Sequence, residues 1–313
     1  MKFLLDTCLA ATSPPLDDED DDRTTTIKDH PVPTRITVLV DDRAVFPGLA
    51  VEHGLALWVE HEGHKLLFDT GASGHALLAN AAALRIRVEE AEAICLSHGH
   101  FDHTGGLGVL APRMGGVDVY AHPDAFVAKY AKSPSGWHAR GMALSQSQLE
   151  AAGIFARLSR DAQEVVPGVF LTGEVPRDPR FVPSTPHLCA DSPMGRIIDP
   201  FHDDQALVLR ARDGLAVVCG CAHSGVINLC RAAQKLMNPR HLVGQSRLRA
   251  VLGGFHLGDA SPQLVAATIE GFRELLPTAI HPLHCTGEAA TRALVLALPD
   301  RCHPIGTGSV VEF

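Results

Sequence analysis

The sequence predicts a mixed α/β protein in which two β-sheets carry helices on their outer faces. Short segments rich in β-branched and aromatic residues, which favour strands, dominate the first half of the chain. In the second half, strand segments alternate with segments of helical composition, as in α/β domains. The length of 313 residues, with 46% hydrophobic and 20% charged residues, suits a globular protein with a substantial core.

The first half is expected to form strands joined mostly by short connections. A segment with helical composition and period lies at 75–84, and a short helix is expected within 105–111. The strands are predicted at 35–40, 55–61, 65–71, 92–98 and 117–122.

The middle of the chain, about 123–205, is less regular. It contains a predicted helix at 123–131, a loop at 132–141, a helix near 145–152 and a proline-rich run at 175–193. A long, partly irregular segment inside a compact protein is usually functional, often a lid or a substrate wall. We therefore predict a substrate-side insert here.

The last third is orderly again. Helices are predicted at 225–237, 262–275 and 287–298. The strands that alternate with them, and a closing strand, are predicted at 206–211, 215–223, 249–256, 278–284 and 308–313.

Residues 1–33 are polar and proline-broken, with an acidic run at 17–22. Such a composition predicts a disordered leader, followed by one domain at 34–313. The first residues resemble a signal peptide, but Asp6 interrupts an already short apolar stretch, so secretion is not predicted.

Composition also narrows the partners and the compartment. A net charge of −9 without a basic stripe argues against nucleic-acid binding. No run approaches the roughly 18 apolar residues of a membrane span. The eight cysteines form no C-x-x-C pair, which suits reduced, buried cysteines and a cytoplasmic protein. The sequence leaves a homo-oligomer open.

Histidine is the unusual residue, with 18 copies beside only two Trp and two Tyr. Separate predicted strands end at or beside His98, His223, His256 and His284. Because ligands in open α/β sheets bind beyond the carboxyl ends of strands, these imidazoles are expected to converge on one site.

The stretch 98–103, His-Gly-His-Phe-Asp-His, concentrates that chemistry. His98 and His100 leave the end of a strand on the same side, while Asp102 and His103 point to a second position nearby. Thr104-Gly105-Gly106 lets the backbone fold tightly beneath them. Imidazole and carboxylate suit zinc, iron or manganese, and two ions roughly 3.5–4 Å apart can activate a water molecule.

"SHGHFDHTGGL" resembles the signature of the metallo-β-lactamase superfamily. Further stretches, among them "GCAHSGVINL", "LGGFHL" and "HCTG", are similar to the subfamily named 7,8-dihydropterin-6-yl-methyl-4-(β-D-ribofuranosyl)aminobenzene-5′-phosphate synthase. The resemblance covers about residues 36–313. It implies an αββα sandwich of two mixed sheets flanked by helices, with one or two zinc ions, or manganese or iron, as cofactor.

The resemblance also implies a ligand set. His98, His100 and His223 would hold one ion, and Asp102, His103 and His284 the other. His256 stands where much of the superfamily has a bridging aspartate, so it is either a ligand or, with Asp102, a catalytic acid/base. Asp69 would orient a ligating imidazole; capping the following helix is the alternative.

Other polar residues are expected near the cleft. Cys219, Cys221 and Cys285 flank the ligands and are interpreted as packing residues, with Cys221, two before His223, as the exception to test. Arg177 would grip an anion or form a surface ion pair. Further residues expected beside the cleft are Glu174, Asp203, Asp204, His53 and His122.

The function this implies is that of a metal-dependent hydrolase using a metal-activated water on an ester, phosphoester or lactone. The alternative is the synthase, a transferase displacing pyrophosphate from a dihydropterin, whose apolar slot would be walled by some of Phe101, Trp137, Phe181 and Phe255. A di-iron redox protein would place a carboxylate where His100 stands, and a non-catalytic binding module would lack ligands. The partner is expected to be a small molecule, phosphorylated or pterin-like.

Overall fold

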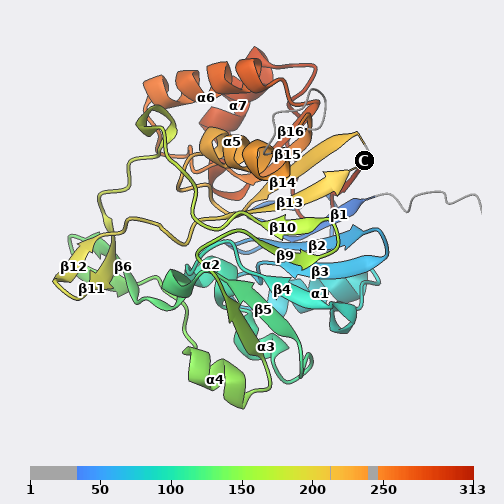
Figure 1. Ribbon diagram of the computed structural model, residues 1–313, viewed down its shortest axis with the longest axis vertical. Coiled ribbons are helices and arrows are strands. Elements are labelled where there is room, and N and C mark those ends of the chain that lie inside the picture. Colours follow the sequence, from blue (N-terminus) through green and yellow to red (C-terminus); the bar gives the residue numbers. More distant parts are fainter. Residues whose placement is uncertain (1–33, 212, 239–245) are drawn as a thin grey trace, which may run out of the picture. The chain divides into compact units, whose positions relative to one another are not determined.

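The computed structural model describes residues 34–211, 213–238 and 246–313 (Figure 1). The predicted acidic leader lies outside the described residues. None of the helices in these ranges is long and apolar enough to cross a bilayer.

Two sheets dominate the described domain. The first has the strand order β17-β1-β2-β3-β4-β5-β8, and its strands change from antiparallel to parallel at the β3–β4 pair. Its strands are β1 (Arg35–Val40), β2 (Ala56–His61), β3 (His64–Phe68), β4 (Ala93–Cys95), β5 (Asp118–Ala121), β8 (Phe155–Leu158) and β17 (Val310–Glu312).

The second sheet has the order β16-β15-β14-β13-β10-β9 and is parallel across β14, β15 and β16. Crossover helices between its parallel strands explain the alternating pattern of the last third of the sequence. The strands are β9 (Gln163–Val166), β10 (Val169–Leu171), β13 (Ala206–Ala211), β14 (Gly214–Cys219), β15 (Leu248–Gly254) and β16 (Ala279–Leu283).

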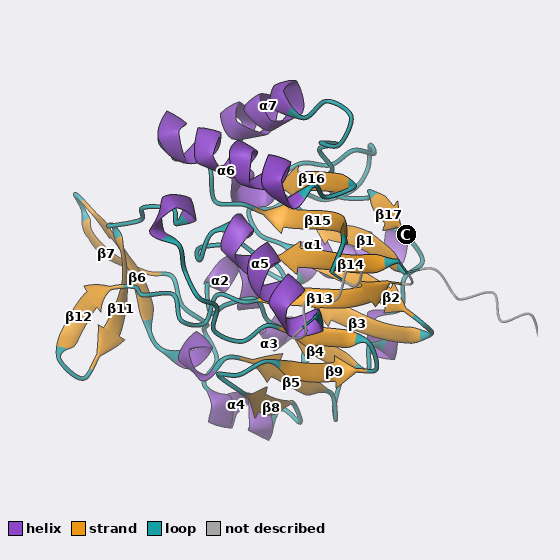
Figure 2. Ribbon diagram, turned by 45° about the horizontal axis from the view of Figure 1, so that its top comes forward, coloured by secondary structure: helices purple, strands orange, loops and turns teal. Residues whose placement is uncertain are grey.

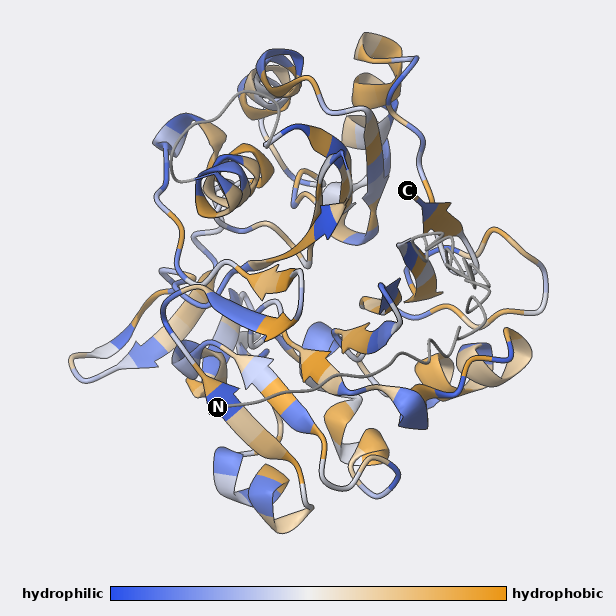
Figure 3. Cartoon of the chain, turned by 45° about the vertical axis from the view of Figure 1, so that its right-hand side comes forward, coloured by the Kyte–Doolittle hydropathy of each residue, from blue (hydrophilic) through white to orange (hydrophobic). Residues whose placement is uncertain are grey.

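The two sheets pack face to face, and helices cover both outer faces (Figure 2). One buried cluster joins the sheets through residues such as Leu57, Phe68, Leu207 and Leu252. The outer cores are formed with α1 (His75–Ala83), α3 (Leu107–Leu110) and α4 (Gln146–Ala151) on one side and with α5 (Val226–Met237), α6 (Pro262–Leu275) and α7 (Glu288–Ala297) on the other. Apolar residues therefore line both sheets and the inner sides of the helices (Figure 3), which confirms the predicted αββα sandwich.

A third, smaller sheet with the order β12-β11-β6-β7 stands beside this sandwich (Figures 1 and 2). It consists of β6 (Lys129–Ser133), β7 (Gly136–Ala139), β11 (Leu188–Ser192) and β12 (Gly195–Ile198). The loop predicted at 132–141 is therefore a β-hairpin. The two outer strands of the small sheet, β7 and β12, are mostly exposed, so they lack the apolar alternation that reveals a strand in sequence. Whether the segment 123–205 serves as a substrate-side insert stays a prediction.

The prediction of a helix at 123–131 is wrong. A single 3₁₀ turn, η2 (Pro123–Phe126), is followed at once by β6. The Lys129 side chain is buried in ion pairs with Asp199 and Asp203, and β6 pairs with β11. Tertiary pairing therefore overrides the local helical composition. The other short elements are η1 (Val88–Glu90), α2 (Phe101–Thr104), η3 (Pro179–Phe181) and η4 (His284–Thr286).

Candidate metal centre

The turn between β4 and α2 carries the first group of candidate ligands. Directly behind it, a Cβ atom on Gly105 would lie 2.0 Å from the Ala72 carbonyl oxygen, and one on Gly106 would lie 2.2 Å from that of Thr70. The structure thus confirms that the glycines are required for the tight fold of this turn.

Three imidazoles meet at the first position. One ring nitrogen each from His98, His100 and His223 lie within 4.8 Å of one another, and all three side chains are buried. The Phe201 ring stacks on His223 with centroids 3.9 Å apart and closes that side. The loops after β4 and β14, far apart in sequence, supply this group, as the strand-end argument predicted.

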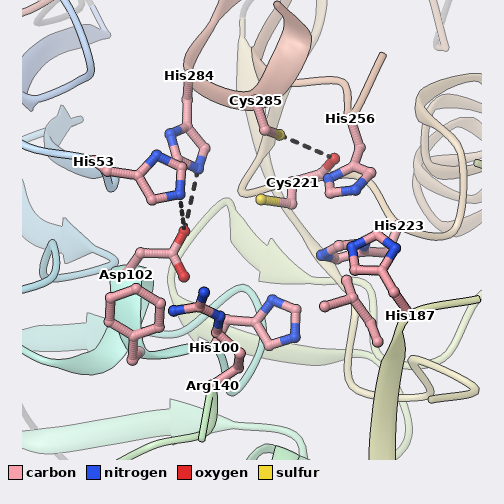
Figure 4. A pocket seen from close by; sticks show the side chains of 12 residues that line it. His53, His100, Asp102, Arg140, His187, Cys221, His223, His256, His284 and Cys285 are labelled. Carbon is pink, nitrogen blue, oxygen red and sulfur yellow. Dashed lines mark hydrogen bonds and ion pairs between the residues drawn. The ribbon is translucent and has the colours of Figure 1, made fainter. Parts of the chain in front are cut away.

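The second group lies next to the first. Asp102 Oδ2 is 3.5 Å from His103 Nε2 and 3.5 Å from His284 Nε2. The His98 and His103 rings are 4.3 Å apart, so the two groups adjoin. Figure 4 shows His284 and His53 both directed at the Asp102 carboxylate.

One buried carboxylate orients the ligands of the β4 turn. Asp69 Oδ2 accepts from His103 Nδ1 at 2.7 Å and from Ser97 Oγ at 2.7 Å. Ser97 Oγ has then used its hydrogen, so it accepts from His98 Nδ1 at 2.9 Å. Both imidazoles therefore carry their proton on Nδ1 and keep the lone pair on Nε2, which is without a hydrogen bond among the described residues in His98 and faces Cys221 Sγ at 3.2 Å in His103. The alternative role of Asp69 as a helix cap is wrong, because the hydrogen bonds of its carboxylate go to Ser97 and His103, while Gly74 is the N-cap of α1 and Ser73 Oγ accepts from the His75 N–H.

Asp42 is a second carboxylate that orients a candidate ligand, and we did not predict this role from the sequence. Asp42 Oδ1 accepts from His284 Nδ1 at 2.8 Å, and Asp42 Oδ2 lies 3.1 Å from His53 Nδ1. Its neighbour Asp41 accepts from the His284 backbone N–H at 2.7 Å. The signal was present, because Asp41 and Asp42 follow the buried strand β1 directly, as ligands follow the other strands.

The electrostatics of the site keep its donors available. Burial holds the pKa of His98 and of His223 well below the ordinary value and lowers that of His100 to about 3. Burial alone would raise the pKa of Asp102, but His103 and His284 reverse this and hold it below its ordinary value. At neutral pH the three imidazoles of the first group are therefore neutral and Asp102 is ionised. Burial alone would lower the pKa of His284, but Cys285, Asp102 and Asp42 reverse this and raise it well above its ordinary value, so His284 must release a proton before its Nε2 can bind an ion.

The segment 199–204 supports both ligand loops. Asp203 accepts from the Gly99 backbone N–H at 2.8 Å, and Asp204 accepts from that of Ser224 at 2.7 Å. Lys129 lies between Asp199 and Asp203, with Nζ–O distances of 2.8 and 3.1 Å. The residues that follow His98 and His223 are thus fixed by buried charge-assisted hydrogen bonds.

Several residues expected beside the cleft have other roles. Arg177 donates to the backbone carbonyls of Pro200 and Phe201, so neither the anion grip nor the surface ion pair is correct. Glu174 pairs with Arg160 and with His122, which is buried away from the cavity. Of the two extra histidines only His53 lines the cavity.

A cavity of about 210 Å³ opens over both groups. Figure 4 shows Cys221, Cys285 and His256 on one side of it and Arg140 on the other, and Arg140 and His187 are exposed. A larger cavity of about 770 Å³ adjoins it, since both are lined by His187 and His256. His256 and His284 have φ of 48° and 49°, a left-handed conformation that is costly for such residues and is typical of functional sites.

The donors fit divalent cations. His98 Nε2 and both ring nitrogens of His223 are buried and form no hydrogen bond within the described ranges. A buried nitrogen without a partner is costly, and a cation shared by His98 Nε2 and one ring nitrogen of His223 would remove that cost at those two atoms. Imidazoles with one carboxylate suit zinc, manganese or iron.

Comparison with known proteins agrees with this geometry. A family model described as "Metallo-beta-lactamase superfamily" matches residues 49–231, more than half of the chain. The chain belongs to the metallo-β-lactamase superfamily. A crystal structure described as Tm1679, a metal-dependent hydrolase of the beta-lactamase superfamily, has a TM-score of 0.74 at 29% identity and covers 90% of this chain and 99% of its own.

The subfamily resemblance is confirmed as well. A 7,8-dihydropterin-6-methyl-4-(beta-D-ribofuranosyl)-aminobenzene-5'-phosphate synthase from Methanocaldococcus jannaschii is 29% identical over 271 residues, 84% of this chain and 90% of that protein. A diphosphatase from the PhnP family, with a TM-score of 0.51, 14% identity and coverage of 90% and 98%, shares the fold alone.

Changing Asp69 to Asn is expected to weaken zinc binding about 10–100-fold, the usual cost of losing a partner that orients a metal ligand. The amide would present an N–H to His103 Nδ1 or to Ser97, so the tautomers would no longer be held. Chelator competition measures the affinity, with Asp118→Asn, a carboxylate on β5 paired with Arg157, as the matched control. Equal zinc affinity in both variants and the native chain would contradict the role of Asp69.

Proposed function

We propose that this chain is a metal-dependent hydrolase whose substrate is a phosphoester or a related anionic ester. His98, His100 and His223 would hold one ion, and Asp102, His103 and His284 a second, with zinc as the first candidate metal. The observation that supports this most strongly is the convergence of these donors, in which Asp69 and Asp42 hold Nδ1 of His103 and of His284 and so direct Nε2 toward the site.

Bound divalent ions would lower the pKa of a water molecule and offset negative charge that develops on the substrate. The protein's own residues do the rest. Asp102 is ionised and turned into the cavity, where it would help to hold the second ion and would orient a nucleophilic water. His256 faces the same cavity, and its Nδ1 has no hydrogen bond to any residue that the structure describes, so it is in position to pass a proton to a leaving oxygen.

Arg140 is what favours an anionic substrate. Its guanidinium lies over the Phe101 ring, 5.3 Å from the centroid, at the mouth of the metal cavity. Among the described residues no carboxylate forms an ion pair with it. A guanidinium binds phosphate oxygens through two parallel hydrogen bonds, so Arg140 would fix a phosphoester beside the ions.

The synthase remains a second candidate, because the likeness to the archaeal synthase extends over most of both chains. The apolar slot expected for a pterin is only partly present. Phe101 lines the metal cavity, but Phe255 is fully buried in the core against Phe272. Phe181 is also buried, and Trp137 lies on the exposed hairpin strand β7. The adjoining 770 Å³ cavity offers room for the rest of either kind of substrate.

One assay separates the two functions. Zinc-loaded and manganese-loaded protein is incubated with p-nitrophenyl phosphoesters, with a neutral p-nitrophenyl ester, and with a dihydropterin pyrophosphate plus the ribosylaminobenzene phosphate acceptor. We expect phosphoester hydrolysis, and a KM at least roughly 10-fold higher for Arg140→Met, the loss of about 1.4 kcal/mol of binding. Arg157→Met, on the surface of β8, is the matched control. Coupled product without hydrolysis would establish the synthase instead, and no turnover of any ester would overturn the hydrolase.

A further inference from the structure

Cys221 occupies the middle of the candidate metal centre. Its sulfur is 3.2 Å from His103 Nε2 and lies within 4.8 Å of a ring nitrogen of His98. The same sulfur lies within 4.8 Å of a ring nitrogen of His223 and of one of His284. It is therefore close to nitrogens from both ligand groups, and in Figure 4 it points into the space between the His284 side and the His223 side.

These separations are near those of atoms bound to a common ion. Zinc lies about 2.0–2.1 Å from an imidazole nitrogen and about 2.3 Å from a thiolate, so two such donors are up to roughly 4.4 Å apart. Shifts of a few tenths of an ångström bring the sulfur into that range for either group. The side chain is 3% exposed and is held at this point by the turn after β14.

The charge of the cavity calls for a second anion. Asp102 is the single carboxylate among its described lining residues. Asp69 and Asp42 are already engaged in holding imidazoles. Two adjacent divalent ions would thus share one carboxylate, and their mutual repulsion in a buried site is large. A thiolate between them would add a second charge where the repulsion is greatest.

We propose that the Cys221 sulfur bridges the two ions as a thiolate, a role that rests on the proposed function having two ions to bridge. Without ions, the S–H group donates to His103 Nε2. On binding, the S–H bond breaks, the proton passes to solvent, and the electron pair that remains on sulfur is shared by the ions. His103 Nε2, freed from that hydrogen bond, then offers its own lone pair to the second ion.

Cys285 provides the contrast within the same cavity. Its sulfur also lies near Cys221 and His284, but it points to the Cys221 carbonyl oxygen, 3.7 Å away (Figure 4). Of the candidate ligands it clusters with His284 of the second group, whereas Cys221 clusters with members of both groups. Cys285→Ser is therefore the matched control for Cys221→Ser.

The direct test uses the unmodified chain. Zinc X-ray absorption of protein loaded with two ions counts the sulfur atoms around the average zinc at about 2.3 Å. A bridging thiolate predicts one sulfur per zinc. An average of half a sulfur neighbour per zinc would mean that Cys221 binds a single ion. If both zincs had only nitrogen and oxygen neighbours, Cys221 would be a packing residue. Either result would overturn the bridge and leave the hydrolase proposal intact, whereas a chain that binds no zinc would overturn both.

Variants identify the sulfur. With cobalt in place of zinc, the native chain should show a sulfur-to-cobalt charge-transfer band that Cys285→Ser keeps and Cys221→Ser loses. Cys221→Ser should also bind the second ion at least about 10-fold more weakly, measured by chelator competition. Loss of the band in Cys285→Ser, or its survival in Cys221→Ser, would contradict the assignment.

Discussion

Replacing His98 with alanine should abolish binding of the first ion and reduce turnover at least roughly 10³-fold. A bound ion supplies several kcal/mol of transition-state stabilisation, and each 1.36 kcal/mol is tenfold in rate. His98 is fully buried, and its Nε2 has no hydrogen-bond partner among the described residues. That nitrogen therefore makes no hydrogen bond there that would stabilise the fold. The ring contacts of His98 with His100, His103 and His223 make it the imidazole shared most closely between both ligand groups.

The comparison requires a histidine that is not near the cavity. His75, the exposed first residue of α1, serves as the matched control, and His75→Ala should keep native zinc content and rate. Zinc per chain is measured by atomic emission and kcat with a phosphoester substrate, after a thermal melt has shown that each variant is folded. Native zinc content and rate in His98→Ala would refute the ligand role.

Replacing Lys129 with methionine should lower the free energy of unfolding by about 3–5 kcal/mol, the cost of removing one partner from a buried ion pair. Lys129, Asp199 and Asp203 are all at most 5% exposed, so the substitution would leave two carboxylates without their cation. Because Asp203 also accepts from the Gly99 N–H, the loop between His98 and His100 should loosen and zinc affinity should fall as well.

Urea unfolding measures this effect, with Lys132→Met as the control on the exposed side of the same strand. Burial alone would lower the pKa of Lys129, but Asp203 and Asp199 reverse this and raise it above 10.5. The ion pair therefore contributes fully below that pH and is lost as pH rises through the raised value. Equal urea midpoints for both variants would show that the buried cluster adds nothing to stability.

The part of the site that follows strand ends was predictable from sequence. His98, His100, Asp102 and His103 come directly after a buried strand, and the structure brings them together with His223 and His284. That prediction works within one sheet, because the carboxyl ends of neighbouring strands meet at one edge. The residues at 98–103 follow a strand of the first sheet, whereas His223 and His284 follow strands of the second, so their meeting also depends on how the two sheets pack.

The residues that orient the ligands were harder to find. Ser97 acts on His98 only because Asp69 takes its hydrogen, and Asp42 reaches His284 from 242 positions away. The first contact depends on the pairing of β3 with β4, and the second on how β1 and β16 are arranged in space. The assignment of Arg177 failed for the same reason, since its partners are backbone carbonyls that leave no mark in the sequence.

Local composition misled where tertiary contacts decided the structure. The helix expected at 123–131 gives way to β6, because a buried lysine pairs with two aspartates about 70 residues later. The small sheet around β6 and β11 was not predicted at all. Strands exposed on both faces carry no apolar periodicity to recognise.

Anomalous X-ray scattering from crystals of the zinc-loaded chain tests the central claim most directly. Two peaks are expected in the cavity, roughly 3.5–4 Å apart. One should be bound by His98, His100 and His223, and the other by Asp102, His103 and His284. Peaks elsewhere on the chain, or zinc-loaded crystals without a peak in this cavity, would contradict the account.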